Sequence, residues 1–173
     1  MFAARIVRVV ELAFRWHVAI SMFVYGIAKT VQFTPTSEVT APANTLTGQQ
    51  LMWAFYGYSS GYAKFLGVVE MLGAGLLLFR RTTLLGYLVL TGVLVNVIAQ
   101  DLVYDVNVGA LRAACIYQGL LLAVVALNGA QVRQVWRALT TPAEGSPMPW
   151  YWLALGAGLV LAATLAIEHG FTH

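Results

Sequence analysis

Charged residues are scarce in this chain: Asp, Glu, Lys and Arg together make up 10% of its 173 residues. Soluble domains carry about a quarter of such residues, whereas 60% of the residues here are hydrophobic. Because a bilayer core about 30 Å thick requires roughly 20 apolar residues per crossing, the length allows about four or five membrane spans. No room remains beside them for a soluble catalytic domain. The composition therefore predicts an integral membrane protein.

Cysteine is nearly absent, since Cys115 is the only one. A single thiol excludes an internal disulfide and CxxC redox chemistry, which argues against a quinone-linked disulfide oxidoreductase. The sequence also contains no P-loop, GxSxG, HExxH or dinucleotide-binding motif. His17 lies at the opposite end of the predicted topology from His169 and His173, so these side chains cannot form a bis-His haem site. We expect no covalent cofactor and no metal site.

Five apolar segments are long enough to be transmembrane helices. The predicted fold is all-α, a polytopic membrane protein with a four-helix transmembrane bundle at 1–128. A cytoplasmic linker follows at 129–149, and a C-terminal transmembrane helix at 150–173. In a four-span alternative, this last helix lies along the membrane. The predicted spans are residues 10–32, 62–79, 83–103, 108–127 and 150–167.

Two different segments connect the first predicted span to the second. Residues 34–50 contain Pro35, Pro42 and Asn44 without an apolar period, which indicates a loop. The aromatic residues of segment 51–58 are typical of the membrane surface, where Trp and Tyr collect. We therefore expect a long outer loop followed by an interfacial segment.

Positive charge is unevenly distributed over the predicted connections. With the N-terminus in the cytoplasm, the cytoplasmic segments carry seven arginines, whereas the opposite side carries Lys64 and several acidic residues. The asymmetry predicts a multi-pass protein of the cell inner membrane with a cytoplasmic N-terminus and a periplasmic C-terminus. It also explains the net charge of +3 without a nucleic-acid partner, and the lipid bilayer is the expected partner instead. The arginines counted here are Arg5, Arg8, Arg15, Arg80, Arg81, Arg133 and Arg137.

Small residues recur every four positions in the last predicted span, at Ala154, Gly158, Ala162 and Ala166. Such a stripe lets another helix approach closely. The second span has a similar face that includes Gly67. These stripes predict helix contacts, and they leave open whether the contacts lie within the chain or in a homo-oligomer.

Polar side chains lie at a similar depth, in the outer half, in four consecutive predicted spans. An ionisable group in hydrocarbon costs several kcal/mol unless it is paired or reaches water, so this alignment is informative. The polar groups of these spans are Lys29, Glu70, Asn96 and Arg112, and the turn after the third span adds Asp101, Tyr104 and Asp105.

These groups are expected to form a paired network, because an unpaired charge would be neutralised in a low dielectric. Glu70 is expected to pair with Lys29 or Arg112. Asp101 or Asp105 is expected to pair with Arg112. Two interpretations stay open: the network only holds the helices in register, or it forms a polar pocket that opens to the outer side or laterally into lipid.

Short motifs in a fixed order resemble those of a known family. The first span ends Tyr25-Gly26-x-x-Lys29-x-x-Gln32-Phe33, and the second begins Tyr62-x-x-Phe65-x-Gly67-x-x-Glu70. Over residues 25–127 the chain resembles the DoxX-like family of small bacterial membrane proteins. It departs from that pattern at Asp101, Asn107 and Gly109. The resemblance implies a four-helix bundle and an association with membrane redox systems, since the founding members are small subunits of quinol or thiosulfate:quinone oxidoreductases.

The leading hypothesis is an accessory or membrane subunit that binds a quinone-like lipophilic molecule in the outer half of the bundle and serves a partner oxidoreductase. The residues expected at the polar head of the ligand are Lys29, Glu70, Asn96 and Arg112. The aromatic residues expected at its ring are Tyr25, Trp53 and Tyr104.

Two alternatives come from other functional classes. In the first, the chain is an acid–base enzyme (an isomerase, cyclase or hydrolase) that acts on a lipophilic substrate through its buried carboxylates. Its catalytic candidates are Glu70, Asp101 and Asp105. In the second, the chain is a structural or assembly subunit without a ligand. Transport is disfavoured, because no internal repeat or pair of broken helices is evident.

Overall fold

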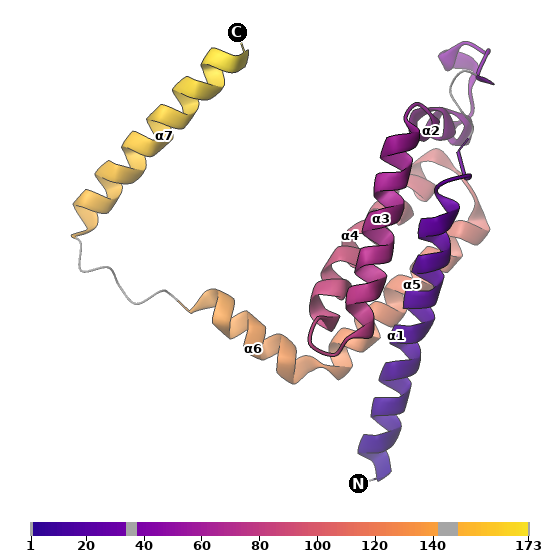
Figure 1. Cartoon of the computed structure of the whole chain (residues 1–173), viewed down its shortest axis with the longest axis horizontal. Helices are drawn as coiled ribbons and strands as arrows, with labels where there is room; N and C mark the ends of the chain where they lie inside the picture. The colour runs from indigo at the N-terminus through magenta and orange to yellow at the C-terminus, as the bar shows by residue number, and fades with distance from the viewer. Residues whose placement is uncertain (1, 34–37, 142–148, 173) are drawn as a thin grey trace. The chain divides into compact units, whose positions relative to one another are not determined.

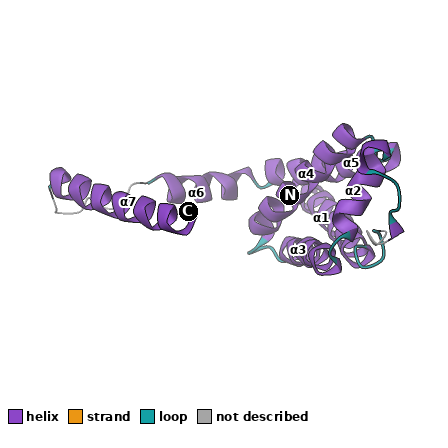
Figure 2. Cartoon of the chain, turned by 90° about the horizontal axis from the view of Figure 1, so that it is seen from above, coloured by secondary structure: helices purple, strands orange, loops and turns teal. Residues whose placement is uncertain are grey.

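The computed structural model describes residues 2–33, 38–141 and 149–172. Within these ranges every regular element is a helix (Figures 1 and 2), which confirms the predicted all-α fold. Residues 34–37 of the predicted loop and 142–148 of the predicted linker lie outside the described ranges. The helices are α1 (Phe2–Ala28), α2 (Gly48–Gly57), α3 (Ser60–Leu78), α4 (Thr83–Tyr104), α5 (Val108–Leu127), α6 (Gly129–Thr140) and α7 (Trp150–Thr172), with a 3₁₀ turn at Ala43–Thr45.

Four of the described helices, α3, α4, α5 and α7, are long and apolar enough to cross a membrane. The chain is therefore an integral membrane protein with transmembrane helices. Helix α1 is 27 residues long, but Glu11, Arg15 and His17 interrupt its apolar sequence. Its crossing of the bilayer, and with it a fifth span, stays a prediction.

The observed helix ends follow the prediction best at α5, which begins and ends where the sequence predicts. Asn107 is the reason for the start, since its Oδ1 accepts hydrogen bonds from the backbone N–H groups of Gly109 at 2.7 Å and Ala110 at 3.1 Å. Helix α1 differs, because it covers Phe2–Ala28 rather than 10–32. Its basic and aliphatic first turns are good helix formers whether or not they lie in lipid.

Helices α1, α3, α4 and α5 form a four-helix bundle within a compact unit, Met1–Gln134. Helix α1 packs against α3 and α5, and α4 also packs against both α3 and α5. Helix α2 contacts α3 and α4 at one end of the bundle (Figure 1). The predicted four-helix bundle is thus confirmed. Its main core consists of Val18, Ala19, Met22, Ala74, Leu77, Leu90, Leu94, Ala114 and Leu121.

The second compact unit, Val135–His173, contains the end of α6 and all of α7. The small-residue stripe of α7 is exposed along its length. A contact of that stripe with another helix or a second copy of the chain stays a prediction. The stripe consists of Ala154, Gly158, Ala162 and Ala166.

Arg15 is buried within the bundle, with 1% of its surface exposed. Its Nε donates to the carbonyl oxygen of Leu77 at 2.8 Å, its Nη2 donates to that of Leu78, and its Nη1 lies 3.3 Å from Glu11 Oε1. The two carbonyls belong to the last turn of α3, where backbone acceptors lack partners within the helix. The sequence predicts Arg15 among the charges of the cytoplasmic segments, but its side chain is not an exposed charge. The guanidinium instead joins α1 to the end of α3.

Gly26 and Gly67 bring α1 and α3 into close approach. A Cβ built on Gly26 would lie 2.7 Å from the carbonyl oxygen of Gly67, and one on Gly67 would collide with the carbonyl oxygen of Gly26. Gly67→Ala is therefore expected to lower the free energy of unfolding by about 1–3 kcal/mol, because the helices must separate. Reversible unfolding in detergent measures this loss.

Gly75→Ala is the matched control on the same helix, since nothing lies within 4 Å of the added methyl group. The control is expected to leave stability unchanged or to raise it slightly through helix propensity. Equal effects of the two substitutions would show that the approach of α1 and α3 does not depend on Gly67.

Candidate functional site

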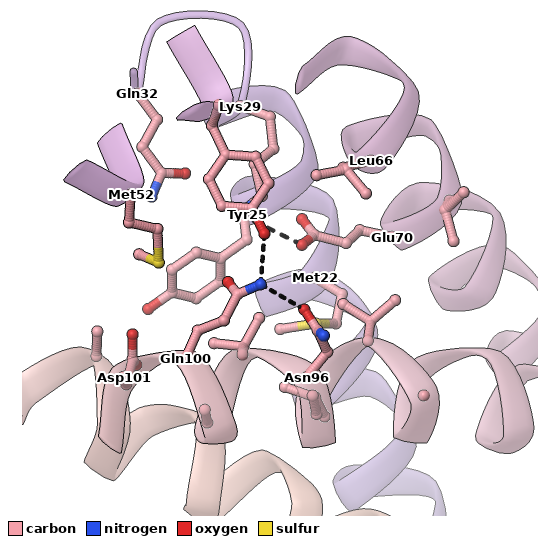
Figure 3. Close-up of a pocket in the computed structure, with 18 of the residues that line it drawn as sticks. Met22, Tyr25, Lys29, Gln32, Met52, Leu66, Glu70, Asn96, Gln100 and Asp101 are labelled. Carbon is pink, nitrogen blue, oxygen red and sulfur yellow. Dashed lines mark hydrogen bonds and ion pairs between the residues drawn. The ribbon is translucent and has the colours of Figure 1, made fainter. Parts of the chain in front are cut away.

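A cavity of about 860 Å³ lies within the helical bundle (Figure 3). All five helices α1 to α5, with the segments that follow α1 and α4, contribute to its wall. The wall is mostly apolar with a few converging polar groups, the usual character of a small-molecule site. The polar and charged side chains that line it, apart from aromatic hydroxyls, are Lys29, Gln32, Glu70, Asn96, Gln100 and Asp101.

Lys29 and Glu70 form the ion pair that the sequence predicts. Lys29 Nζ lies 3.6 Å from Glu70 Oε1, and Glu70 is buried, with 4% of its surface exposed. Because α1 and α3 run antiparallel, each residue lies beside the glycine of the other helix: a Cβ on Gly67 would lie 3.2 Å from Lys29 Cβ, and one on Gly26 would lie 3.5 Å from Glu70 Cβ. The glycine contact therefore positions the pair.

A second polar group joins α2 to α4. Gln100 Nε2 donates to Tyr56 Oη at 2.5 Å and to Asn96 Oδ1 at 2.8 Å. Burial raises the pKa of the Tyr56 hydroxyl above its ordinary value of about 10. Tyr56 is therefore neutral at physiological pH, and its own proton remains available for donation to another group.

Aromatic rings cover the end of the cavity beside α2. The ring of Tyr56 stacks on Phe33, with centroids 4.8 Å apart, and on Tyr62 at 6.0 Å. Trp53 meets Phe33 edge-on at 5.4 Å, and its indole N–H donates to the backbone oxygen of Gln32 at 3.0 Å. This cluster offers ring faces suited to a planar ligand.

The cavity opens along one stripe of α4. Leu88, Gly92 and Asn96 recur every four residues, line the cavity and are exposed. The opening lies along the side of α4 and not at the end of the helix. Because α4 is a candidate membrane span, this side would face lipid. A lipophilic molecule could enter laterally from the bilayer.

Six of the nine predicted site residues line this cavity: Tyr25, Lys29, Trp53, Glu70, Asn96 and Asp101. They come from α1, α2, α3 and α4, and from the segment after α1. Most of the predicted set therefore lies together.

Arg112, Tyr104 and Asp105 do not line this cavity, so the structure does not bring them together with the other six. Arg112 is exposed, and its expected pairs with Glu70 and with the two aspartates are absent among the described ion pairs. Helix α5 turns Ala110 and Ala114 toward the cavity, and a residue midway between them points to the opposite side.

Tyr104 and Asp105 lie where α4 ends. Asp105 is exposed and adopts a left-handed conformation, with φ at 47°, as the C-terminal cap of the helix. Tyr104 is exposed as well. Tyr104 lines a separate pocket with Gln100 and Tyr56, whereas neither Tyr104 nor Asp105 lines the main cavity.

Several lining residues are absent from the predicted site. Gln100 follows Asn96 by four positions, so helical spacing places both on one face of α4, whereas Gln32 lies after the end of α1. Tyr56 gives no such signal, because its place depends on how α2 docks. Within the described residues, no group of three or more His, Cys, Asp or Glu side chains is placed to hold a metal ion.

Comparison with curated proteins finds a relative in Bacillus subtilis (strain 168), the uncharacterized protein YwoB. It is 36% identical over 116 residues, which cover 65% of this chain and 74% of the relative. The chain belongs to the YwoB family. No family model and no solved structure matches the chain. Membership of the YwoB family brings no reaction with it, and the resemblance to the DoxX-like family stays a prediction.

Proposed function

We propose that the chain binds a quinone-like lipophilic small molecule in the cavity lined by helices α1 to α5. The observation that carries the proposal is a cavity of about 860 Å³, within the range of about 300–1,000 Å³ typical of ligand sites. A network that served only to hold the helices in register would be expected to pack without such a space. The exposed stripe on α4 supports lateral entry of a lipophile.

The side chains suggest how such a ligand would lie. Lys29 Nζ would meet an oxygen of the ring, and Glu70, paired with it, would exchange a proton with that oxygen. The ring itself would rest against Phe33, Tyr56 and Tyr62, whose faces cover the end of the cavity. Tyr104, which the sequence predicts at the ring, does not line this cavity.

The cellular setting is part of the same proposal. The chain would be an accessory or membrane subunit of a redox system, related to DoxX-like proteins, and would serve a partner oxidoreductase. It would lie in the cell inner membrane with its N-terminus in the cytoplasm. The exposed arginines of the α1 start, the α3–α4 turn and α6 support this orientation. They are Arg5, Arg8, Arg80, Arg81, Arg133 and Arg137.

An acid–base enzyme is the second candidate. Glu70 and Asp101 line the same cavity and are both buried, so two carboxyl groups face one prospective substrate. Asp105 has no part in this arrangement, because it lies outside the cavity. Conversion of a lipophilic substrate by the purified chain alone would favour this candidate over a binding subunit.

Gly92→Leu tests the proposed binding site. Nothing lies within 4 Å of a Cβ on Gly92, so a side chain can be added there without a clash at its first atom, and leucine would extend into the lateral opening. Binding of a short-chain benzoquinone by the purified protein in nanodiscs is expected to weaken by at least about tenfold, a loss of about 1.4 kcal/mol. Isothermal titration calorimetry measures the dissociation constant.

Gly119→Leu is the matched control. Gly119 also has nothing within 4 Å of an added Cβ, and it lies on α5 outside the cavity wall. The control is expected to bind as tightly as the original chain, and both variants should unfold at an unchanged or slightly higher temperature. Unaltered quinone binding by Gly92→Leu, or no binding by the original chain, would refute the proposed site.

A further inference from the structure

The buried side-chain atoms without a hydrogen-bond partner, among the described residues, are all oxygens. Three of them belong to side chains that line the cavity: Gln32 Oε1, Glu70 Oε2 and Asp101 Oδ2. The three residues come from different elements, namely the segment after α1, α3 and α4, and Figure 3 shows them around one space. Among the fully buried polar atoms that line the cavity, the unmet capacity is therefore for acceptance of hydrogen bonds.

Several donors at the cavity, in contrast, are already engaged within the protein. Lys29 Nζ faces Glu70 Oε1, and Gln100 Nε2 donates to both Tyr56 and Asn96. The indole N–H of Trp53 is used by a backbone oxygen. A ligand that carries only acceptors would compete for these donors and leave the three oxygens unmatched.

An unpaired buried acceptor destabilises the complex, and more so when it is charged. Water can meet that need in an empty cavity, but a ring that enters displaces the water and must replace its hydrogen bonds. A hydroquinone carries O–H donors at opposite ends of its ring. The corresponding quinone carries carbonyl oxygens there, which would face the carboxylate oxygens of the protein.

We propose that the ligand binds as a hydrogen-bond donor, so that the cavity selects the hydroxyl-bearing hydroquinone over the oxidised quinone. This inference rests on the proposed function, and it adds the form of the ligand that the site holds. Selection of the reduced form also raises the midpoint potential of the bound couple. A tenfold preference corresponds to about 30 mV for a two-electron couple.

The test uses the full chain in nanodiscs without oxygen and compares three ligands that share one ring. The ligands are a short-chain benzohydroquinone, its dimethyl ether and the parent benzoquinone. The hydroquinone is expected to bind at least about tenfold more tightly than either of the others. The dimethyl ether is the decisive comparison, because it keeps the ring and both oxygens and has no O–H donor.

Asp101→Asn extends the test, since it replaces one acceptor oxygen by an N–H₂ donor. The ratio of hydroquinone to quinone affinity is expected to fall severalfold. Asp105→Asn, the matched control outside the cavity, should leave the ratio unchanged. The ligand comparison needs no substitution, so it decides the question even where a variant fails to fold.

The outcomes separate the two proposals. If quinone or dimethyl ether binds as tightly as hydroquinone, the selection of a donor is overturned, while the binding site stands. If none of the three ligands binds, the proposed function fails and this inference fails with it.

Discussion

Replacement of Arg15 with Met is expected to lower the free energy of unfolding by about 3–5 kcal/mol, the range for removal of one partner from a buried charged pair. The guanidinium is 1% exposed and donates to two carbonyls at the end of α3 and to Glu11. Without it, those carbonyls and the Glu11 carboxylate lose a donor in a place that water does not easily reach. Methionine keeps much of the volume, so the loss reports on the hydrogen bonds rather than on a void.

Arg8→Met is the matched control, because Arg8 is an exposed arginine of the same helix. It removes the same charge and is expected to change stability by less than about 0.5 kcal/mol. Reversible unfolding in mixed detergent micelles would measure both variants. Equal effects of Arg15→Met and Arg8→Met would mean that the end of α3 does not depend on the guanidinium.

Glu11 extends this contact to a third helix. Asn128 Nδ2, at the end of α5, donates to Glu11 Oε1 at 3.2 Å and to the carbonyl oxygen of Val124 at 2.8 Å. The middle of α1 and the ends of α3 and α5 therefore share one polar network. The residues of this network are not among those that line the cavity.

Much of the fold could be predicted from the sequence, because membrane spans are dictated by apolar length. Helices α3, α4 and α5 lie within about two residues of their predicted positions. The buried role of Arg15 could not be predicted in this way. An arginine near the end of an apolar segment looks like an interfacial charge, and only the position of the α3 carbonyls shows that it has partners inside the bundle.

In the candidate site, the sequence predicts how deep a residue lies in the bundle but not on which side of its helix it lies. Rise along a helix gives the depth of a residue, and depth correctly brings Lys29 and Glu70 together. Direction around the axis requires an amphipathic pattern, which α5 lacks because it is apolar on nearly every face. Arg112 therefore shares the predicted depth of the site but lies on the wrong side of its helix. The position of Tyr56 depends on docking of α2, which no periodic pattern encodes.

The Lys29–Glu70 pair distinguishes a ligand site from a device that only holds helices in register. Lys29→Met alone leaves the buried Glu70 carboxylate without its cation and is expected to cost about 3–5 kcal/mol of stability. The double variant Lys29→Met, Glu70→Leu removes both charges and replaces them with apolar groups of similar size. Because such replacements are often neutral or stabilising, the double variant is expected to recover most of the lost stability.

Quinone or hydroquinone binding, unlike stability, is not expected to recover in the double variant. Stability returns in the double variant, but the cavity has lost both its cation and a carboxylate, so the affinity should stay at least about tenfold below that of the original chain. Unfolding measurements and titration calorimetry on the same nanodisc preparations compare the two properties directly. If the double variant regains both stability and full affinity, the pair only holds α1 against α3, and the ligand must be recognised elsewhere in the cavity.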